Sequence, residues 1–274
     1  MYPLMTKPMT DNSALQHHRA RATAAGMFLH AAAADELQDR LEMVNKSFTN
    51  PALVTGFSEY WASRQPEATI VSDKETLDLT PNTHDLVAHV MGLHWANDPV
   101  GQLIQCRRAL QPDGLFIGIS FGGDTLQELR RALAEAEIAV TGGLSPRIAP
   151  MPELRDLGGL LQRAGFALPV ADTAVISVEY RDIWHLMHDI RAMGETNALS
   201  ARLRHPTRRA VFDHAQKLYA EHFAAPSGRL IASFELQVLT GWAPDASQPQ
   251  PLRPGSAQQR LADVLGAAEK PLRD

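Results

Sequence analysis

A histidine and a tryptophan, His94 and Trp95, follow the apolar run 85–91 after two intervening residues. A histidine at the end of a buried strand can act as a general base, because its unperturbed pKa lies near neutral pH. The competing interpretation is a packed aromatic pair beneath a helix predicted over 99–110. Both interpretations stay open, and under the first the two residues are the candidate catalytic groups.

Glycines follow two further apolar runs. Gly56 comes after the run 52–55, and the pair Gly122 and Gly123 comes after the run 115–121. Glycine lets a backbone approach a ligand closely, and open α/β sheets bind ligands at the carboxyl ends of their strands. We therefore expect these glycines to bind a cofactor, although each could simply form a strand–helix turn.

Two aspartates accompany these turns. Asp73 ends the run 70–72, and Asp124 follows the glycine pair. Asp124 could cap a helix predicted over 125–139, with Gln127 three positions on completing a capping box. A structural role and a ligand-binding role carry equal weight at this turn, so Asp124 is a candidate cofactor-binding residue.

A metal site is not expected. His185, His188 and Asp189 lie one helical turn apart and could in principle ligate iron. All three fall on one short predicted helix, where a solvated face is the simpler explanation. Cys106 is the only cysteine, so an internal disulfide and a thiolate metal cluster are both excluded.

Charge and hydropathy limit the partners. The formal net charge of −5 gives no electrostatic reason to expect nucleic acid. The longest apolar stretch, 24–34, is interrupted by His30 and is about half the ~20 residues that a bilayer requires, so no integral membrane segment is predicted. The lone cysteine fits a reducing compartment, and we expect the cytoplasm. A basic cluster could dock an acidic protein surface or form a solvated charge run: Arg202, Arg204, Arg208 and Arg209.

Short apolar runs alternate with helical patterns along the middle of the chain. Strands are predicted over 52–55, 68–72, 85–91 and 115–121, and helices over 57–64, 99–110 and 125–139. Strands separated by helices of this length pair in parallel through right-handed crossovers. The fold class is therefore α/β, an open, doubly wound, mostly parallel sheet with helices on both faces.

The ends of the chain differ from this pattern. Residues 1–11 read as a loose leader, and 13–48 as helical with a break near 31–34. After the loop 142–150, the second half is predicted to hold a helix over 152–164, a strand over 171–179, helices over 181–193 and 206–223, and a β-run over 229–240 that pairs with the preceding strand as an antiparallel edge. The expected division is a helical segment 1–50, an α/β domain 51–243 with a helical insertion at about 181–223, and a tail 244–274.

Several strings give this chain a family resemblance. The stretch 84–133 resembles strands four and five of a class I S-adenosylmethionine-dependent methyltransferase. More narrowly, the chain resembles the methyltransferase-like assembly factors of respiratory complex I (NADH:ubiquinone oxidoreductase). The strings are LHWAND (93–98), PDGLFIGISFGGDTLQELR (112–130), GGLSPRIAPMPELRDLGGLLQRAGF (142–166), MGETNAL (193–199) and GWAP (241–244).

The resemblance implies a function and a cofactor. The eukaryotic member of the family is thought to hydroxylate an arginine of a core subunit, so a complex I subunit is the implied partner. S-adenosylmethionine is the implied cofactor, held by a glycine turn after the first strand, where Gly56 stands, and by an acid after the second, for which Asp73 is the candidate.

The implied cofactor site departs from the family pattern. Phe57 and Tyr60 bring bulk beside Gly56, and the spacing after Asp73 fits the third strand of the family rather than its second. We therefore predict a sheet that has lost one strand–helix unit between Gly56 and Ala68. Asp73 would then lie near the adenine, no acid would remain for the ribose, and S-adenosylmethionine would bind weakly or not at all.

Three functions remain open. The first is an enzyme-like factor that modifies or escorts a complex I subunit. The second is a binding module with catalysis lost, which holds its partner through 181–223. The third is an active methyltransferase for a small-molecule or carrier-protein carboxylate, from a more distant resemblance to the malonyl-carrier-protein methyltransferase of biotin synthesis. An intact pocket at 55–60 favours the first, and a pocket filled by Phe57 or Tyr60 favours the second. The family resemblance is thinnest at residues 54–60. We therefore expect function to depend more on residues 121–125 and 181–223 than on residues 54–60.

Overall fold

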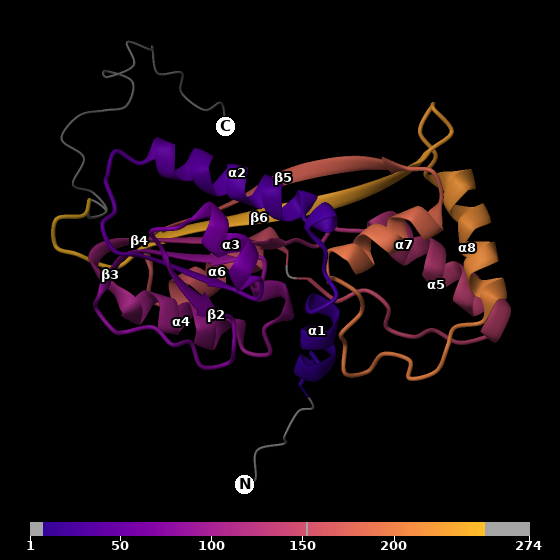
Figure 1. The fold of residues 1–274 in the computed structure, drawn as a ribbon, viewed down its shortest axis with the longest axis horizontal. Coiled ribbons are helices and arrows are strands. Elements are labelled where there is room, and N and C mark those ends of the chain that lie inside the picture. Colours follow the sequence, from indigo (N-terminus) through magenta and orange to yellow (C-terminus); the bar gives the residue numbers. More distant parts are fainter. Residues whose placement is uncertain (1–7, 152, 250–274) are drawn as a thin grey trace, which may run out of the picture. The chain divides into compact units, whose positions relative to one another are not determined.

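The described strands form one mixed sheet. The computed structural model describes residues 8–151 and 153–249, and contacts divide the chain into the units Met1–Pro244 and Asp245–Asp274, of which the first carries the fold below. Its six strands lie in the order β2-β1-β3-β4-β6-β5 (Figure 1). They are β1 (Pro51–Thr55), β2 (Thr69–Ser72), β3 (His84–Val90), β4 (Leu110–Phe121), β5 (Ala167–Tyr180) and β6 (Leu230–Trp242). The first four pair in parallel, and β6 runs antiparallel to both neighbours, which confirms the predicted mostly parallel α/β sheet.

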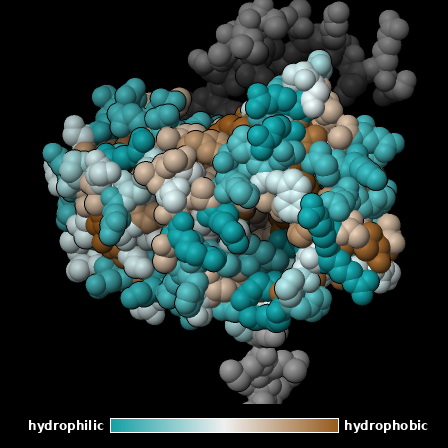
Figure 2. Space-filling model, turned by 45° about the vertical axis from the view of Figure 1, so that its right-hand side comes forward, coloured by the Kyte–Doolittle hydropathy of each residue, from teal (hydrophilic) through white to brown (hydrophobic). Residues whose placement is uncertain are grey.

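Helices cover both faces of this sheet because neighbouring strand residues point to opposite sides. Leu53 joins a core with the helices α2 (Phe28–Met43), α3 (Ser58–Arg64), α5 (Gln127–Thr141), α7 (Ile183–Ala192) and α8 (Arg209–His222). Ala52 and Val54 join a second core with α4 (Pro99–Ala109) and α6 (Leu154–Arg163). Within the described ranges, no helix combines the length and apolarity needed to cross a membrane. Hydrophilic residues predominate on the face drawn in Figure 2, with apolar ones scattered in small groups.

The N-terminal helical region breaks earlier than predicted. Helix α1 (Asn12–Arg19) is followed by a single 3-10 turn, η1 (Ala24–Gly26), and α2 then runs on without a break at 31–34. The cause is a tertiary contact, since the Thr23 amide donates to the Ala192 carbonyl at 2.8 Å and a Cβ on Gly26 would overlap Ala192. Residues 8–11 are also anchored rather than loose, and 1–7 lie outside the described residues.

The sheet has one strand–helix unit fewer than that of a standard class I methyltransferase, as predicted, but the predicted position of the missing unit is wrong. Strand β1, helix α3 and β2 form a complete parallel unit, so nothing is missing between Gly56 and Ala68. The shortened connection is 73–83. It contains no helix and joins β2 to β3, which lie on opposite sides of β1 in the sheet. Spacing alone could not show this, because it does not reveal which strand lies beside β1.

The second half follows its predicted order. Helices α7 and α8 lie between the long strands β5 and β6, which pair antiparallel from Ala167–Trp242 to Tyr180–Leu230. This segment is the helical insertion expected at about 181–223. The full division into 1–50, 51–243 and 244–274 stays a prediction, since most of the tail lies outside the described residues.

Candidate functional site

A cavity of about 1030 Å³ opens at the carboxyl ends of three neighbouring strands. Gly56 follows β1, Asp73 follows β2, and Gly92 lies just beyond β3; all three line it. Helix α1 and the segment 95–97 also contribute to the wall. This is the edge at which open α/β sheets bind ligands.

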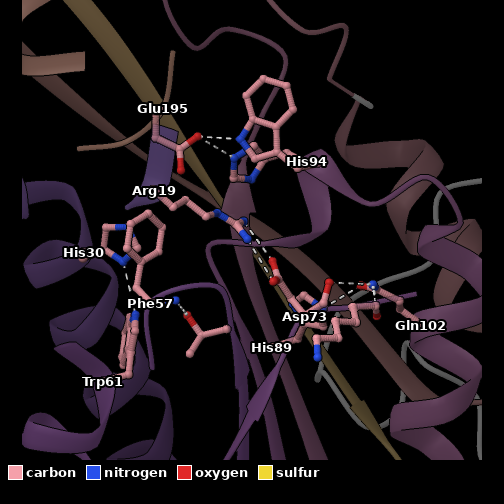
Figure 3. A network of polar contacts seen from close by, with 12 residues as sticks. Arg19, His30, Phe57, Trp61, Asp73, His89, His94, Gln102 and Glu195 are labelled. Atoms are coloured by element: carbon pink, nitrogen blue, oxygen red, sulfur yellow. Dashed lines mark hydrogen bonds and ion pairs between the residues drawn. The ribbon is translucent and has the colours of Figure 1, made fainter. Parts of the chain in front are cut away.

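An arginine from α1 forms part of this cavity wall. The Nη1 and Nη2 atoms of Arg19 donate to the two carboxylate oxygens of Asp73 at 2.9 and 2.8 Å (Figure 3). The guanidinium also lies 5.3 Å from the centroid of the Phe57 ring, and a Cβ on Gly56 would overlap it. The absence of a side chain on Gly56 therefore provides the space in which Arg19 reaches Asp73.

The structure places the candidate cofactor-binding residues Gly56 and Asp73 in the wall of the same cavity. Strand β2 pairs directly with β1, Thr55 opposite Ser72, so Asp73 ends the strand next to the glycine turn. The expectation that no acid remains at this position is therefore wrong. Their binding of a cofactor stays a prediction, and the Asp73 carboxylate is already engaged by Arg19.

Phe57 and Tyr60 line the cavity without filling it. The Phe57 side chain is buried and packs its ring 4.4 Å from that of His30, and Tyr60 lies 5.6 Å from the same ring. His30 in turn accepts a hydrogen bond from the Trp61 indole at 3.1 Å. Burial lowers the pKa of His30 to about 4, so this aromatic cluster holds a neutral imidazole.

The floor beside Asp73 is fixed by a second buried histidine. His89 bonds through Nε2 to the Gln102 side chain at 2.9 Å, and Gln102 donates to the backbone carbonyls of Asp73 and Lys74. Burial lowers the pKa of His89, with the Asp73 charge opposing the shift. A Cβ on Gly92 would lie 2.7 Å from the Asp73 carboxylate, so a glycine is needed there.

His94 and Trp95 converge on a residue that the sequence did not single out. His94 Nε2 lies 3.1 Å from Glu195 Oε2, and the Trp95 indole donates to the same oxygen at 2.6 Å (Figure 3). Burial opposes ionisation of Glu195, but the charge and hydrogen bond of His94, then Arg19 and the Trp95 bond, bring its pKa to about 2. The three residues form a buried polar cluster, and catalysis by the first two stays a prediction. The string MGETNAL had included Glu195, although nothing marked it as functional.

A second cavity lies on the other side of Trp95. It has a volume of about 460 Å³, and most of its lining is apolar. Trp95 lines both cavities, and Glu195 lines the second. The two cavities could thus hold a cofactor and an acceptor side by side.

The turn at Gly122, Gly123 and Asp124 does not reach the larger cavity. Phe121 and Thr125 on either side of it line the second cavity instead. The predicted capping box is wrong, because α5 begins at Gln127 and no side chain caps it. The Asp124 amide donates to Glu235 Oε2 at 2.8 Å, so the turn is pinned to β6. Cofactor binding by these three residues stays a prediction that the cavity does not support.

The remaining polar clusters have structural partners. No group of three His, Cys, Asp or Glu side chains suited to a metal occurs among the described residues, and the His185 ring packs 5.4 Å from Tyr180. Three of the four arginines of the basic cluster are engaged as well, since Arg202 and Arg204 donate to Asp11 at 3.0 and 3.3 Å and Arg209 forms an ion pair with Asp213 at 3.9 Å. The bonds to Asp11 hold the start of α1 against the insertion, and so help to position Arg19.

Comparison with known proteins gives consistent relatives. A methyltransferase domain family matches residues 20–118. The mitochondrial arginine-hydroxylase NDUFAF5 of Danio rerio is 35% identical over 226 residues, covering 81% of this chain and 69% of that protein. Its Homo sapiens counterpart is 40% identical over 202 residues, covering 73% and 57%. The chain therefore spans between about half and two thirds of the length of these relatives.

Two other matches complete the comparison. The malonyl-[acyl-carrier protein] O-methyltransferase of Xylella fastidiosa is 34% identical over 187 residues, covering 68% of this chain and 60% of that protein. Among solved structures, a putative methyltransferase from Bacillus halodurans superposes with a TM-score of 0.51 at 11% identity, covering 77% of this chain and all of that one. This structural likeness supports the methyltransferase fold alone.

Proposed function

The chain belongs to the NDUFAF5 family of methyltransferase-like complex I assembly factors, and from this premise we propose that it modifies a protein subunit during assembly of respiratory complex I. The proposed target is an arginine side chain of that subunit, because the relatives are named arginine-hydroxylases. The proposed active site is the pair of cavities on either side of Trp95.

One observation favours this enzymatic function over a purely binding role. Phe57 and Tyr60, which could have filled the pocket, form part of its wall and leave about 1030 Å³ at the strand ends. An open cavity of this size beside a second, apolar one favours a protein that brings a cofactor and an acceptor together. A binding module that had lost catalysis would have no need of the paired cavities. The insertion 181–223 then serves as the region that faces the partner, because α7 lines the second cavity.

S-adenosylmethionine is the proposed cofactor, and its site is compromised in a specific way. The cavity has the volume for it, and Gly56, Asp73 and Gly92 are residues of the kind that would hold it. Bound there, it would supply an electron-poor sulfonium. The Asp73 carboxylate that would meet the ribose hydroxyls is held by Arg19, so the cofactor must compete with a bidentate ion pair whose side chains are each 9% exposed. Binding is therefore weak until Arg19 moves away.

The proposed location is a reducing, aqueous compartment. The cytoplasm was expected from the sequence, and the named relatives are mitochondrial. The single cysteine, Cys106, is buried, which fits either of them. The alternative function, methylation of a small-molecule or carrier-protein carboxylate as in the malonyl relative, is disfavoured because the ionised Glu195 in the second cavity would repel such an acceptor.

The test is complementation in a strain that lacks the native gene. The wild-type chain should restore assembled complex I, measured by native gel electrophoresis and NADH oxidation. Mass spectrometry of the complex I subunits should show an arginine that carries an additional oxygen only when the chain is present. The proposed reaction exchanges one C–H bond of the arginine for C–OH with dioxygen as the oxidant and a separate two-electron donor, so that the second oxygen atom leaves as water. Assembly restored without any modified arginine would leave escort as the function, and no restoration at all would refute a role in complex I.

A further inference from the structure

The Glu195 carboxylate has one oxygen without a partner. His94 and Trp95 both bond to Oε2, while Oε1 is buried and makes no hydrogen bond with any described residue (Figure 3). The side chain is only 6% exposed, and the pKa is lowered to about 2, so the group is a buried carboxylate that stays ionised. Buried charges in proteins are normally paired or fully hydrogen-bonded. An ionised oxygen left over in the wall of a cavity indicates a ligand that donates hydrogen bonds to it.

The walls of the second cavity favour a cationic donor. Aromatic rings line it, including Trp95, Phe121, Trp184 and Phe212, the last two packed with centroids 5.3 Å apart. Aromatic faces attract cations, and the planar guanidinium both stacks on rings and donates to carboxylates. The cavity, at about 460 Å³, also has apolar walls for an aliphatic stem.

The charges around the cavity leave Glu195 as its acidic group. Among the described lining residues it is the only carboxylate. Arg147, which also lines the cavity, is bound to Glu137 at 2.8 and 2.9 Å, and Arg191 and His188 lie exposed on α7, where solvent screens them. Arg19 attracts Glu195 from the other side, but both of its terminal nitrogens are committed to Asp73.

We propose that Glu195 determines substrate specificity by binding the guanidinium of a substrate arginine, with Oε1 as the acceptor and the aromatic walls around the stem. This proposal rests on the proposed function and adds to it the residue that recognises the side chain. His94 and Trp95 act as positioning residues here, since they hold Oε2 and leave Oε1 for the ligand.

The test uses two blocked amino acids that differ mainly in charge. Nα-acetyl-L-arginine amide and Nα-acetyl-L-citrulline amide are titrated against the full-length chain, with quenching of Trp95 and Trp184 fluorescence as the signal. A charge-assisted bond to a buried carboxylate should make the arginine probe bind about 10- to 100-fold tighter. Glu195→Gln keeps the shape and an acceptor for Trp95, and it should bring the two affinities to within about twofold, the effect of losing one charged acceptor.

A matched control separates recognition from folding. Glu128→Gln changes another buried carboxylate, but one whose two oxygens already accept from Ser233, so its selectivity should equal that of the wild type. Equal affinity of the wild-type chain for the arginine and citrulline probes would overturn the proposal without any variant. So would a folded Glu195→Gln chain that keeps the full preference.

Complementation then separates this proposal from the proposed function. If the wild-type chain restores complex I but shows no arginine preference, the role of Glu195 fails and the assembly function stands. If the preference is present and lost in Glu195→Gln, but the gene is dispensable for complex I, the guanidinium site stands and the assembly function fails.

Discussion

Arg19 and Asp73, 54 residues apart in the sequence, form a bidentate ion pair with N···O distances of 2.9 and 2.8 Å in the wall of the larger cavity. The pair joins helix α1 to the end of β2 and places a guanidinium against the glycine turn after β1. This ion pair therefore links helix α1 to the floor of the cavity.

Removing this guanidinium should strengthen cofactor binding. In Arg19→Met, the Asp73 carboxylate becomes free to accept from ribose hydroxyls, and a gain of about 1.5–3 kcal/mol per charge-assisted hydrogen bond corresponds to one to two decades in affinity. Isothermal titration calorimetry with S-adenosylmethionine measures it, and the wild-type chain should bind weakly. Arg21→Met is the control, because Arg21 bonds to His17 and His18 and not to Asp73. A wild-type dissociation constant in the low micromolar range, or weaker binding in Arg19→Met, would contradict the competition.

Valine should be tolerated better at Gly56 than at Gly122. At Gly56 the new side chain meets the end of the flexible Arg19, which can move. At Gly122 it would lie 2.6 Å from the buried Gln237 side chain, and overpacking of this kind costs about 1–3 kcal/mol. Because Phe121 and Thr125 flank that turn and line the second cavity, Gly122→Val should impair complex I assembly more in the complementation assay. At equal protein abundance, loss of assembly in Gly56→Val alone would show that the glycine turn after β1 matters more.

Stability should fall on mild acidification because of His30. Burial lowers its pKa from 6.5 to about 4. Between these two pH values, His30 is mostly protonated in the unfolded chain and mostly neutral in the folded chain. Stability is therefore complete above pH ~6.5 and is lost as the pH falls towards ~4, by up to about 3 kcal/mol. Urea unfolding at pH 7 and pH 5 should show a smaller difference for His30→Asn, which keeps an acceptor for Trp61, than for the wild type. His185→Asn, at an exposed histidine, should leave the difference unchanged; a pH response of His30→Asn equal to that of the wild type would refute the assignment.

The Trp95 indole should help to keep Glu195 ionised. Trp95→Phe preserves an aromatic wall between the two cavities but removes the 2.6 Å bond to Oε2. One donor fewer makes the carboxylate form less favourable, so the Glu195 pKa should rise from about 2. Carbon-13 NMR titration of labelled glutamate carboxyls measures the change, and Glu195→Gln identifies the resonance. An unchanged pKa would mean that His94 and Arg19 alone hold the charge.

The free energy of unfolding should also depend on Glu195 at acidic pH, where this carboxylate becomes protonated. Because the folded pKa of Glu195 is depressed from 4.5, its contribution is present above pH ~4.5 and is lost as the pH falls towards 2. Replacement by Gln should therefore flatten the unfolding free energy between pH 4.5 and 2, separately from the His30 effect at higher pH.

The sequence by itself determined the elements and the edge on which the site lies. Apolar runs alternating with helical patterns predicted the strands and helices to within a few residues, because side-chain periodicity and turn residues are local properties. They also placed Gly56, Asp73, His94 and Trp95 at strand ends, and so at the edge where the cavities open.

Only the tertiary structure decided which of these residues meet. The pairing of β2 with β1 returned Asp73 to the glycine turn, although spacing had assigned it elsewhere. Arg19 reaches the site from a helix before the sheet, and Glu195 from a loop about 100 residues beyond Trp95. Such contacts depend on how whole elements pack, and a buried ion pair or an unpartnered carboxylate oxygen leaves no local pattern in the sequence, because its energy comes from burial and from neighbours that are distant along the chain.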